Sequence, residues 1–213
     1  QFPEARVLRV DRDSVKSRKQ WEAVLERIHG GEADILVGTQ MLAKGHDFPK
    51  LTLVGALGAD AALFAADWRA PERLFAQLMQ VAGRAGRAEL KGEVLIQTEY
   101  PAHPLYLHLA HHDFDAFARM ELQARRSAGF PPFSHQAMLR ADAPAVDDAV
   151  EFLRHARRLA DERAPDGLRI FDPVPMRMTR LARRERAQLL IEADQRSPLQ
   201  AFLADWVAQL YRQ

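Results

Sequence analysis

Short continuous runs of apolar residues constrain the fold of this chain more than any other feature. Residues 35–37, 51–57 and 94–97 form three such runs, and residues 7–10 form a further β-rich segment. A strand buried on both faces shows this pattern, because neither of its sides meets water. Segments with helical spacing separate several of these runs. The alternation predicts an α/β fold over residues 1–112, with helices on the faces of a parallel sheet.

Two helices are expected between these strands. The first carries Trp21 on its apolar face and ends near Gly30, and Asp13 and Ser14 are candidates for its N-terminal cap. The second begins at Pro71, a residue that suits the first turn of a helix. In sheets of this kind, functional side chains lie in the loops beyond the carboxyl ends of the strands.

The second half of the chain has a different organisation. Residues 113–129 have the pattern of one amphipathic helix, and Pro131 and Pro132 follow it directly. We therefore expect residues 113–132 to connect two domains. Residues 133–213 show the order β-α-β-β-α, which predicts a small α+β domain with its helices on one side.

The composition excludes several classes of function. Lys and Arg number 30 against 29 Asp and Glu, so the formal net charge is +1 and a uniformly basic nucleic-acid-binding surface is excluded. The chain has no cysteine, which excludes disulfides, Cys-ligated zinc and a thiol nucleophile. No apolar run approaches the length of a membrane-spanning helix, and the first residues lack the features of a signal peptide. A cytoplasmic location is expected. Because the first residue is not Met, we also expect the chain to be part of a longer protein.

Positive charge is nevertheless concentrated in one segment. Residues 176–186 contain one acid, Glu185, and five arginines, which are Arg177, Arg180, Arg183, Arg184 and Arg186. One interpretation is a solvated loop. The other is a nucleic-acid contact, because a local excess of positive charge on a nearly neutral chain attracts phosphate.

Residues 80–87, with the sequence QVAGRAGR, form the sharpest motif. Arg84 and Arg87 are three residues apart, so both guanidinium groups can point the same way from a helical turn. Gly83 lets another surface approach the backbone closely, and Gln80 can hydrogen-bond a polar group one turn earlier. This array suits a polyphosphate, whose oxygens match a guanidinium fork. The alternative is a helix end whose arginines bind carbonyls or carboxylates.

A second motif, GTQMLAKGHDFP, occupies residues 38–49 and follows a predicted strand directly. Thr39 and neighbouring backbone N–H groups can hold a phosphate, and Asp47 can accept a hydrogen bond from a ribose hydroxyl. The alternative is an ordinary helix cap followed by a turn.

Together the two motifs resemble motifs V and VI of superfamily 2 helicases, which lie in the second RecA-like lobe of those enzymes. The likeness extends to the PriA family of replication-restart helicases, in which residues 35–49, 59–73, 80–87, 130–133, 172–175 and 186–190 have close counterparts. Gly58 departs from that family, which often has a polar residue there. The resemblance implies a RecA-like lobe 2 over residues 1–112 and a DNA- and partner-binding domain over 133–213.

The resemblance also implies roles for individual residues. Arg87 corresponds to an arginine finger on the γ-phosphate, Arg84 lies beside it on the phosphates, and Gln80 reaches toward the catalytic water. The resemblance also assigns nucleotide binding to Gly45, Asp47 and Gly83. It assigns DNA binding to Thr39, Gln40, Lys44 and the five arginines named above. ATP and Mg²⁺ are the implied cofactors of the intact protein. The family's cysteine-rich zinc module has no counterpart here, and no metal ligand is assigned to this chain.

The implied function is ATP-dependent 3′-to-5′ translocation on DNA, with recognition of stalled or branched forks and primosome assembly. The implied partners are single-stranded and forked DNA, the single-stranded-DNA-binding protein and other primosome proteins, with no membrane. The chain lacks a G-x-x-x-x-G-K-[ST] phosphate loop, so by itself it is expected to be inactive on ATP. One alternative is a stand-alone DNA- or protein-binding module. Another is an unrelated hydrolase that uses Asp60 or Asp67 with a histidine.

His108, His111 and His112 have a spacing that could ligate a metal from a helix. We expect instead that they are surface or packing residues at a helix end. The three tryptophans, Trp21, Trp68 and Trp206, are expected to be buried or partly buried anchors rather than stacking platforms for bases.

Overall fold

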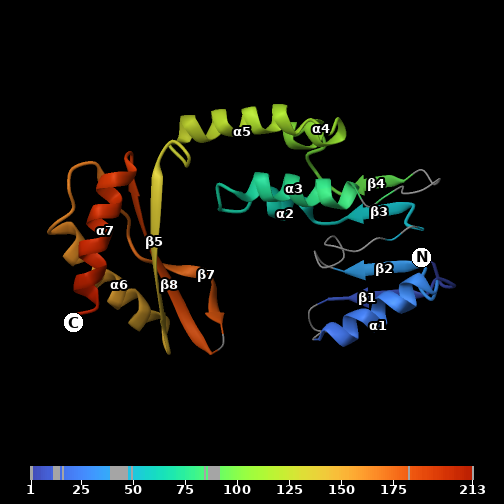
Figure 1. The fold of residues 1–213 in the computed structure, drawn as a ribbon, viewed down its shortest axis with the longest axis horizontal. Helices are drawn as coiled ribbons and strands as arrows, with labels where there is room; N and C mark the ends of the chain where they lie inside the picture. Colours follow the sequence, from blue (N-terminus) through green and yellow to red (C-terminus); the bar gives the residue numbers. More distant parts are fainter. Residues whose placement is uncertain are drawn as a thin grey trace. The chain divides into compact units, whose positions relative to one another are not determined.

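The chain folds into two units, whose helices and strands are drawn in Figure 1. The computed structural model describes residues 2–11, 15, 17–38, 48, 50–83, 85, 92–181 and 183–212, with side chains for all of these except 177–181. The first unit is Gln1–Met120 and the second is Glu121–Gln213. The boundary falls inside helix α5 (Phe114–Ala128), within the segment expected to connect two domains. Each unit mixes helices and strands, so the predicted α/β class is confirmed.

The first unit contains two pairs of parallel strands. Strand β1 (Val7–Val10) pairs with β2 (Ile35–Gly38), and β3 (Leu53–Ala56) pairs with β4 (Glu93–Ile96). Parallel neighbours need a long crossover connection, and helix α1 (Arg18–His29) lies in the first of these. The positions of the strands expected from the apolar runs are confirmed. The expected burial on both faces is not, because Val37, Leu53 and Leu95 are each about half exposed.

Helix α1 begins at a different cap from the one expected. The Ser17 hydroxyl accepts a hydrogen bond from the Gln20 backbone N–H at 3.3 Å, and the Gln20 side chain accepts one from the Ser17 N–H at 3.1 Å. This reciprocal pair is a capping box, which satisfies two backbone donors that the helix cannot. Ser17 is therefore the cap, and the assignment to Asp13 and Ser14, which lie outside the described residues, was wrong.

Helices supply most of the core of the first unit. They are α2 (Ala59–Leu63), α3 (Ala70–Ala82), α4 (Pro104–Ala110) and the first half of α5. Phe75 of α3 stacks on Phe117 of α5 with ring centroids 4.1 Å apart, and both side chains are buried. Leu74 and Leu78 are buried in the same cluster. Because apolar residues recur along one side of α3, that side is fixed against the core.

The second unit is one antiparallel sheet with two helices. Its elements in chain order are β5 (His135–Ala143), α6 (Val146–Asp161), β6 (Leu168–Ile170), β7 (Val174–Leu181), β8 (Arg184–Ala193) and α7 (Arg196–Leu210). Strand β8 is central, with β5 along one edge and both β6 and β7 along the other. Figure 1 shows α6 and α7 beside this sheet.

Both helices pack on the same face of the sheet. Ala187, Leu189 and Ile191 of β8 are fully buried in one cluster with residues of α6 and α7. Side chains alternate between faces along a strand, so the intervening residues of β8 lie on the opposite face. Trp206 of α7 is 3% exposed in this cluster, and its Nε1–H donates to the Ala156 carbonyl at 2.9 Å. Its expected role as a core anchor is confirmed.

The order of elements contains one strand more than expected. One interpretation of the arginine-rich segment was a solvated loop, but residues 174–181 form β7 and pair with β8. Apolar residues at 174, 176 and 178 alternate with other residue types, which is the period of a strand. The pairing shifts register between Pro175 and Arg180, so the ladder is irregular. The order is therefore β-α-β-β-β-α.

No helix in the described part of the chain is long and apolar enough to cross a membrane.

Candidate nucleotide-binding and DNA-binding residues

Helix α3 presents the start of the QVAGRAGR motif at its C-terminal end. Gln80 lies in the last turn and Gly83 caps the helix, and both residues are exposed. The Gly83 backbone N–H donates to the Met79 carbonyl at 3.0 Å. A Cβ on Gly83 would meet that same oxygen at 3.4 Å, an ordinary contact, so the space around the residue does not itself require glycine. The structure thus brings Gln80 and Gly83 together at an accessible helix end.

Several predicted site residues fall outside the described residues. They are Thr39, Gln40, Lys44, Gly45, Asp47, Arg84 and Arg87. Of the described elements next to them in the sequence, β2 ends at Gly38 and α3 ends at Ala82. The roles of these seven residues stay predictions.

The carboxylate of Asp60 is held by three hydrogen bonds. Thr98 Oγ1 donates to it at 2.6 Å, the Glu99 backbone N–H at 2.8 Å, and the Tyr106 hydroxyl at 3.2 Å. The hydrogen bond from Thr98, followed by that from Glu99, holds the pKa of Asp60 below its ordinary value. Burial, the largest influence, raises the pKa of Tyr106. Asp60 therefore joins α2 to the segment after β4 and to α4.

This arrangement does not favour a hydrolase that uses Asp60 or Asp67. The described hydrogen bonds of Asp60 come from Thr98, Glu99 and Tyr106, and none comes from a histidine. Asp67 accepts from the Arg69 backbone N–H at 2.9 Å and from Arg73 at 2.7 Å. In the described part of the chain, neither carboxylate has a hydrogen bond to the histidine that this hypothesis requires.

The arginine-rich segment forms the β7–β8 hairpin. Arg180 lies opposite Glu185, and Leu181 lies opposite Arg184. Arg183 in the turn is exposed and has a φ of 64°. Arg184 donates to the Asp142 carbonyl of β5 at 2.5 Å, which ties the hairpin to the neighbouring strand.

Three of the five arginines have described side chains, namely Arg183, Arg184 and Arg186, and they lie within four residues of one another. For Arg177 and Arg180 only the backbone is described. A hairpin holds its side chains in fixed directions, so it presents charge to a ligand at less entropic cost than a solvated loop. The geometry is compatible with a phosphate contact.

The three histidines near the end of α4 do not gather around a common point that could hold a metal. Nδ1 of His111 lies 2.8 Å from the Leu107 carbonyl, in hydrogen-bonding contact. Among all described residues, no group of three His, Cys, Asp or Glu side chains is placed to bind a metal ion.

The face of the second sheet on the side away from α6 and α7 was not singled out from the sequence. There Phe171, which directly follows β6, is 43% exposed, and Met138 of β5 is 44% exposed. Sequence periodicity could not say which face residue 171 occupies, because that depends on the register with β8.

Two family models match the chain, one after the other. The helicase conserved C-terminal domain matches residues 4–89, which contain β1, β2 and α3. The primosomal protein N C-terminal domain matches residues 126–213, which contain the sheet and helices of the second unit. The two matched segments therefore follow the same division as the structure.

Curated relatives agree with both matches. The chain is 44% identical over 205 residues to the replication restart protein PriA of Haemophilus influenzae, covering 96% of this chain and 28% of that protein. It is 38% identical over 192 residues to PriA of Synechocystis sp., covering 90% and 23%. It is 37% identical over 202 residues to PriA of Bacillus subtilis, covering 95% and 25%. The chain spans about a quarter of the length of these relatives. With a helicase C-terminal domain match followed by a primosomal one, the chain is similar over most of its length to the replication restart proteins of the PriA family.

Proposed function

We propose that this chain works within an ATP-dependent DNA helicase that restarts replication at stalled or branched forks. In this proposal the first unit contributes the arginine finger, and the second contributes a DNA- and partner-binding domain. The observation that carries it is the succession of a helicase match over residues 4–89 and a primosomal match over residues 126–213 on one chain. Motif QVAGRAGR falls inside the helicase match.

On the nucleotide side, Arg87 stabilises the charge that develops on the γ-phosphate, and Arg84 binds the phosphates beside it. Gln80 orients the attacking water, and Gly45 and Asp47 approach the ribose. Phosphoryl transfer depends mainly on positioning and charge stabilisation, so a rigid support matters. The support for this step is α3, whose buried face fixes the helix from which Gln80 projects.

The described residues do not form a Mg²⁺ site by themselves. We therefore assign no step of the reaction to a metal held by this chain. The proposal places ATP and its Mg²⁺ at a phosphate loop in the intact protein, since no such sequence occurs in these 213 residues. By the same reasoning the chain alone does not hydrolyse ATP.

On the DNA side, Thr39, Gln40 and Lys44 contact the backbone of the translocated strand, which moves 3′ to 5′. Contacts to phosphates carry no sequence information, as a translocating motor requires. The hairpin arginines add contacts to branched DNA. The single-stranded-DNA-binding protein and other primosome proteins are the proposed protein partners, and the proposed location is cytoplasmic.

A second candidate is a stand-alone DNA- or protein-binding module without ATPase activity. The missing phosphate loop is the observation that favours it. The two candidates differ in whether ATP is hydrolysed when the chain is joined to the rest of a helicase.

DNA-stimulated ATP hydrolysis tests the proposal. We expect no turnover by this chain alone, turnover by the intact protein, and loss of turnover in Arg87→Ala with nucleotide binding retained. Arg154→Ala is the matched control, because Arg154 lies on α6 in an exposed ion pair with Glu151. Equal turnover in Arg87→Ala and the control would contradict the finger assignment. An intact protein without ATPase activity would favour the binding module.

A further inference from the structure

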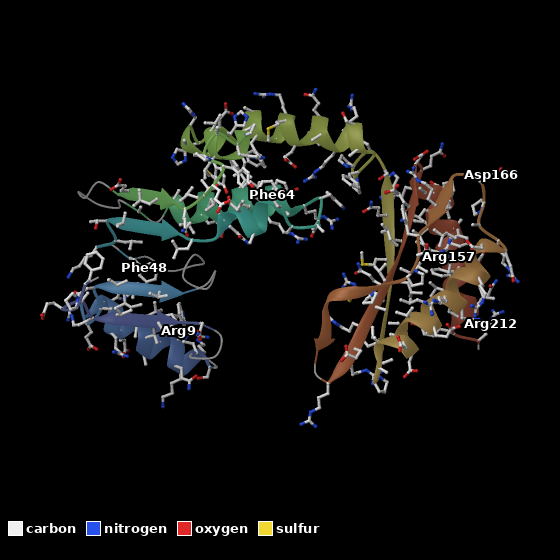
Figure 2. All side chains as sticks on the ribbon, turned by 180° about the vertical axis from the view of Figure 1, so that it is seen from behind. Arg9, Phe48, Phe64, Arg157, Asp166 and Arg212 are labelled. Atoms are coloured by element: carbon white, nitrogen blue, oxygen red, sulfur yellow. The ribbon has the colours of Figure 1, made fainter. Side chains whose placement is uncertain are left out.

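The face of the second sheet opposite α6 and α7 is open within the described second unit. The helices cover the side of Leu189 and Ile191, where Ile170 also packs. Arg157 of α6, labelled in Figure 2, forms an ion pair with Asp172, which therefore points to the helix side. Its neighbour Phe171 points the other way, because consecutive side chains alternate. What we call the open face is defined by Met138, Arg140, Arg169, Phe171, Arg186 and Leu190.

An apolar strip crosses the middle of the open face. Met138 of β5 lies directly opposite Leu190 of β8. On the other side of β8, the Phe171 backbone N–H donates to the Leu190 carbonyl at 2.9 Å, which continues the ladder of β6 by one residue. Phe171 and Met138 are 43% and 44% exposed. Phe171, Leu190 and Met138 thus form a row across the sheet, and the two side chains at its ends are exposed to water.

Arginines flank the strip on both sides. Arg169 lies one residue before Phe171, and Arg140 and Arg186 lie toward the hairpin. The buried carboxylate of Glu192 accepts from Arg169 at 2.6 Å and from Gln136 at 2.7 Å, so its charge is compensated within the sheet.

Asp142 is a second acid on this face and lies opposite Arg186. Asp194 lies 3.7 Å from Arg169, so two carboxylates share the charge of Arg169. The exposed side chain of Arg140 adds positive charge on β5, and Arg183 and Arg184 continue it along the hairpin. The open face therefore combines an apolar centre with a positive border.

We propose that the open face binds single-stranded DNA, with unpaired bases on the strip and phosphates on Arg140 and Arg186. The proposal rests on the DNA-binding function proposed above and assigns it a second surface beside the hairpin. Aromatic side chains on an open sheet bind unpaired bases by stacking, and arginines along the strand neutralise its phosphates. Paired bases hide their faces, so the strip favours single strands over duplex. The centre of a protein–protein interface is depleted in charge, which fits the arginine-rich border less well.

Fluorescence anisotropy with this 213-residue chain tests the proposal. The probes are a labelled oligothymidylate of about 20 nucleotides, which exceeds the site size of one binding domain, and a duplex of the same length. Phe171→Ala is compared with Phe152→Ala, because Phe152 of α6 is 45% exposed and therefore matches Phe171 in size and exposure. We expect Phe171→Ala to weaken single-strand binding about tenfold, or about 1.4 kcal/mol. Phe152→Ala and duplex binding should stay within about twofold of the unchanged chain.

Two further measurements separate stacking from misfolding. Phe171→Trp keeps an aromatic ring and should bind the single strand as well as the unchanged chain does. Hydrogen exchange of β8 in each variant checks that the second unit is still folded. An oligonucleotide containing 5-iododeoxyuridine should photo-crosslink to the peptide that contains Phe171. Equal binding by Phe171→Ala and Phe152→Ala, or crosslinks confined to other elements, would overturn the proposal.

The hairpin variant distinguishes the two levels of inference. If changing Arg180, Arg183 and Arg184 together to Ala weakens DNA binding while Phe171→Ala does not, the open-face proposal is overturned and the proposed function stands. If the unchanged chain binds neither probe at low salt, DNA binding by this chain and the open-face proposal both fail. A loss of single-strand binding in Phe171→Ala, with duplex binding intact, supports the open face specifically.

Discussion

Trp206→Phe should destabilise the second unit selectively. The indole is 3% exposed, stacks on Phe202 with centroids 5.8 Å apart, and donates to the Ala156 carbonyl at 2.9 Å. Phenylalanine keeps one ring in place but removes the N–H and leaves part of the volume unfilled. The variant thus tests whether α7 is fixed to α6 through this contact.

The magnitude follows from two contributions. Ala156 lies inside α6, so its carbonyl also accepts the regular helix hydrogen bond, and losing the indole donor costs only about 0.5–1.5 kcal/mol. The missing part of the ring removes roughly two or three buried CH₂ equivalents, or about 1.5–2.5 kcal/mol. The free energy of unfolding of the second unit should therefore fall by about 2–4 kcal/mol.

Hydrogen exchange read by mass spectrometry is the suitable assay, because it reports each unit separately where a global melting curve mixes them. Protection of α6 and β8 should fall by about 30-fold to several hundredfold, at about 1.4 kcal/mol per factor of ten. Peptides from α3 and α4 in the first unit are the internal control and should not change. A fall of less than about threefold in α6 and β8 would refute the reasoning.

Three further predictions concern the backbone and charges of the fold. Replacing Asp60 by Asn should destabilise the fold most at neutral pH and less as the pH falls below about 4. The lowered pKa of Asp60 means that its ionised form stabilises the fold only above that range. Thermal melting at pH 7 and pH 3 measures this, and an equal loss of stability at both pH values would contradict it. Ser17→Ala removes the capping box and should lower the stability of α1 by about 1 kcal/mol, seen as faster hydrogen exchange there but not in α7. Gly129 directly follows α5 and has a φ of +67°, so Gly129→Ala should lower the free energy of unfolding by about 1–2 kcal/mol. An unchanged urea midpoint would show that the turn after α5 tolerates a side chain.

The sequence allowed accurate prediction of elements with a strong period. Strand β2 and the amphipathic α5 were predicted to within one or two residues. Helix α2 was missed because it has only five residues, too few for a helical period, and begins after Gly58 with a φ of +67°. Strand β7 was missed because its arginines outweighed the alternation of its apolar residues.

For the candidate site, local spacing predicted only that the QVAGRAGR motif starts near a helical turn. Gln80 and Gly83 lie at the end of α3, in agreement with this, while their roles stay predictions. The open face was not predictable, since Phe171 meets Leu190 only through the register of β6 with β8. A register depends on contacts between residues far apart in the sequence, and a shift by one residue would place Phe171 on the helix side.

The most direct test of the central claim is an anisotropy titration of this chain with single-stranded and forked DNA, at two salt concentrations, with and without ATP. We predict salt-sensitive binding that ATP does not change, because the second unit holds a DNA site of its own. Replacing Arg180, Arg183 and Arg184 by Ala should lower the salt slope for single strands by about two, at about 0.7 per phosphate contact. No binding at low salt, or an unchanged slope in that variant, would contradict the account.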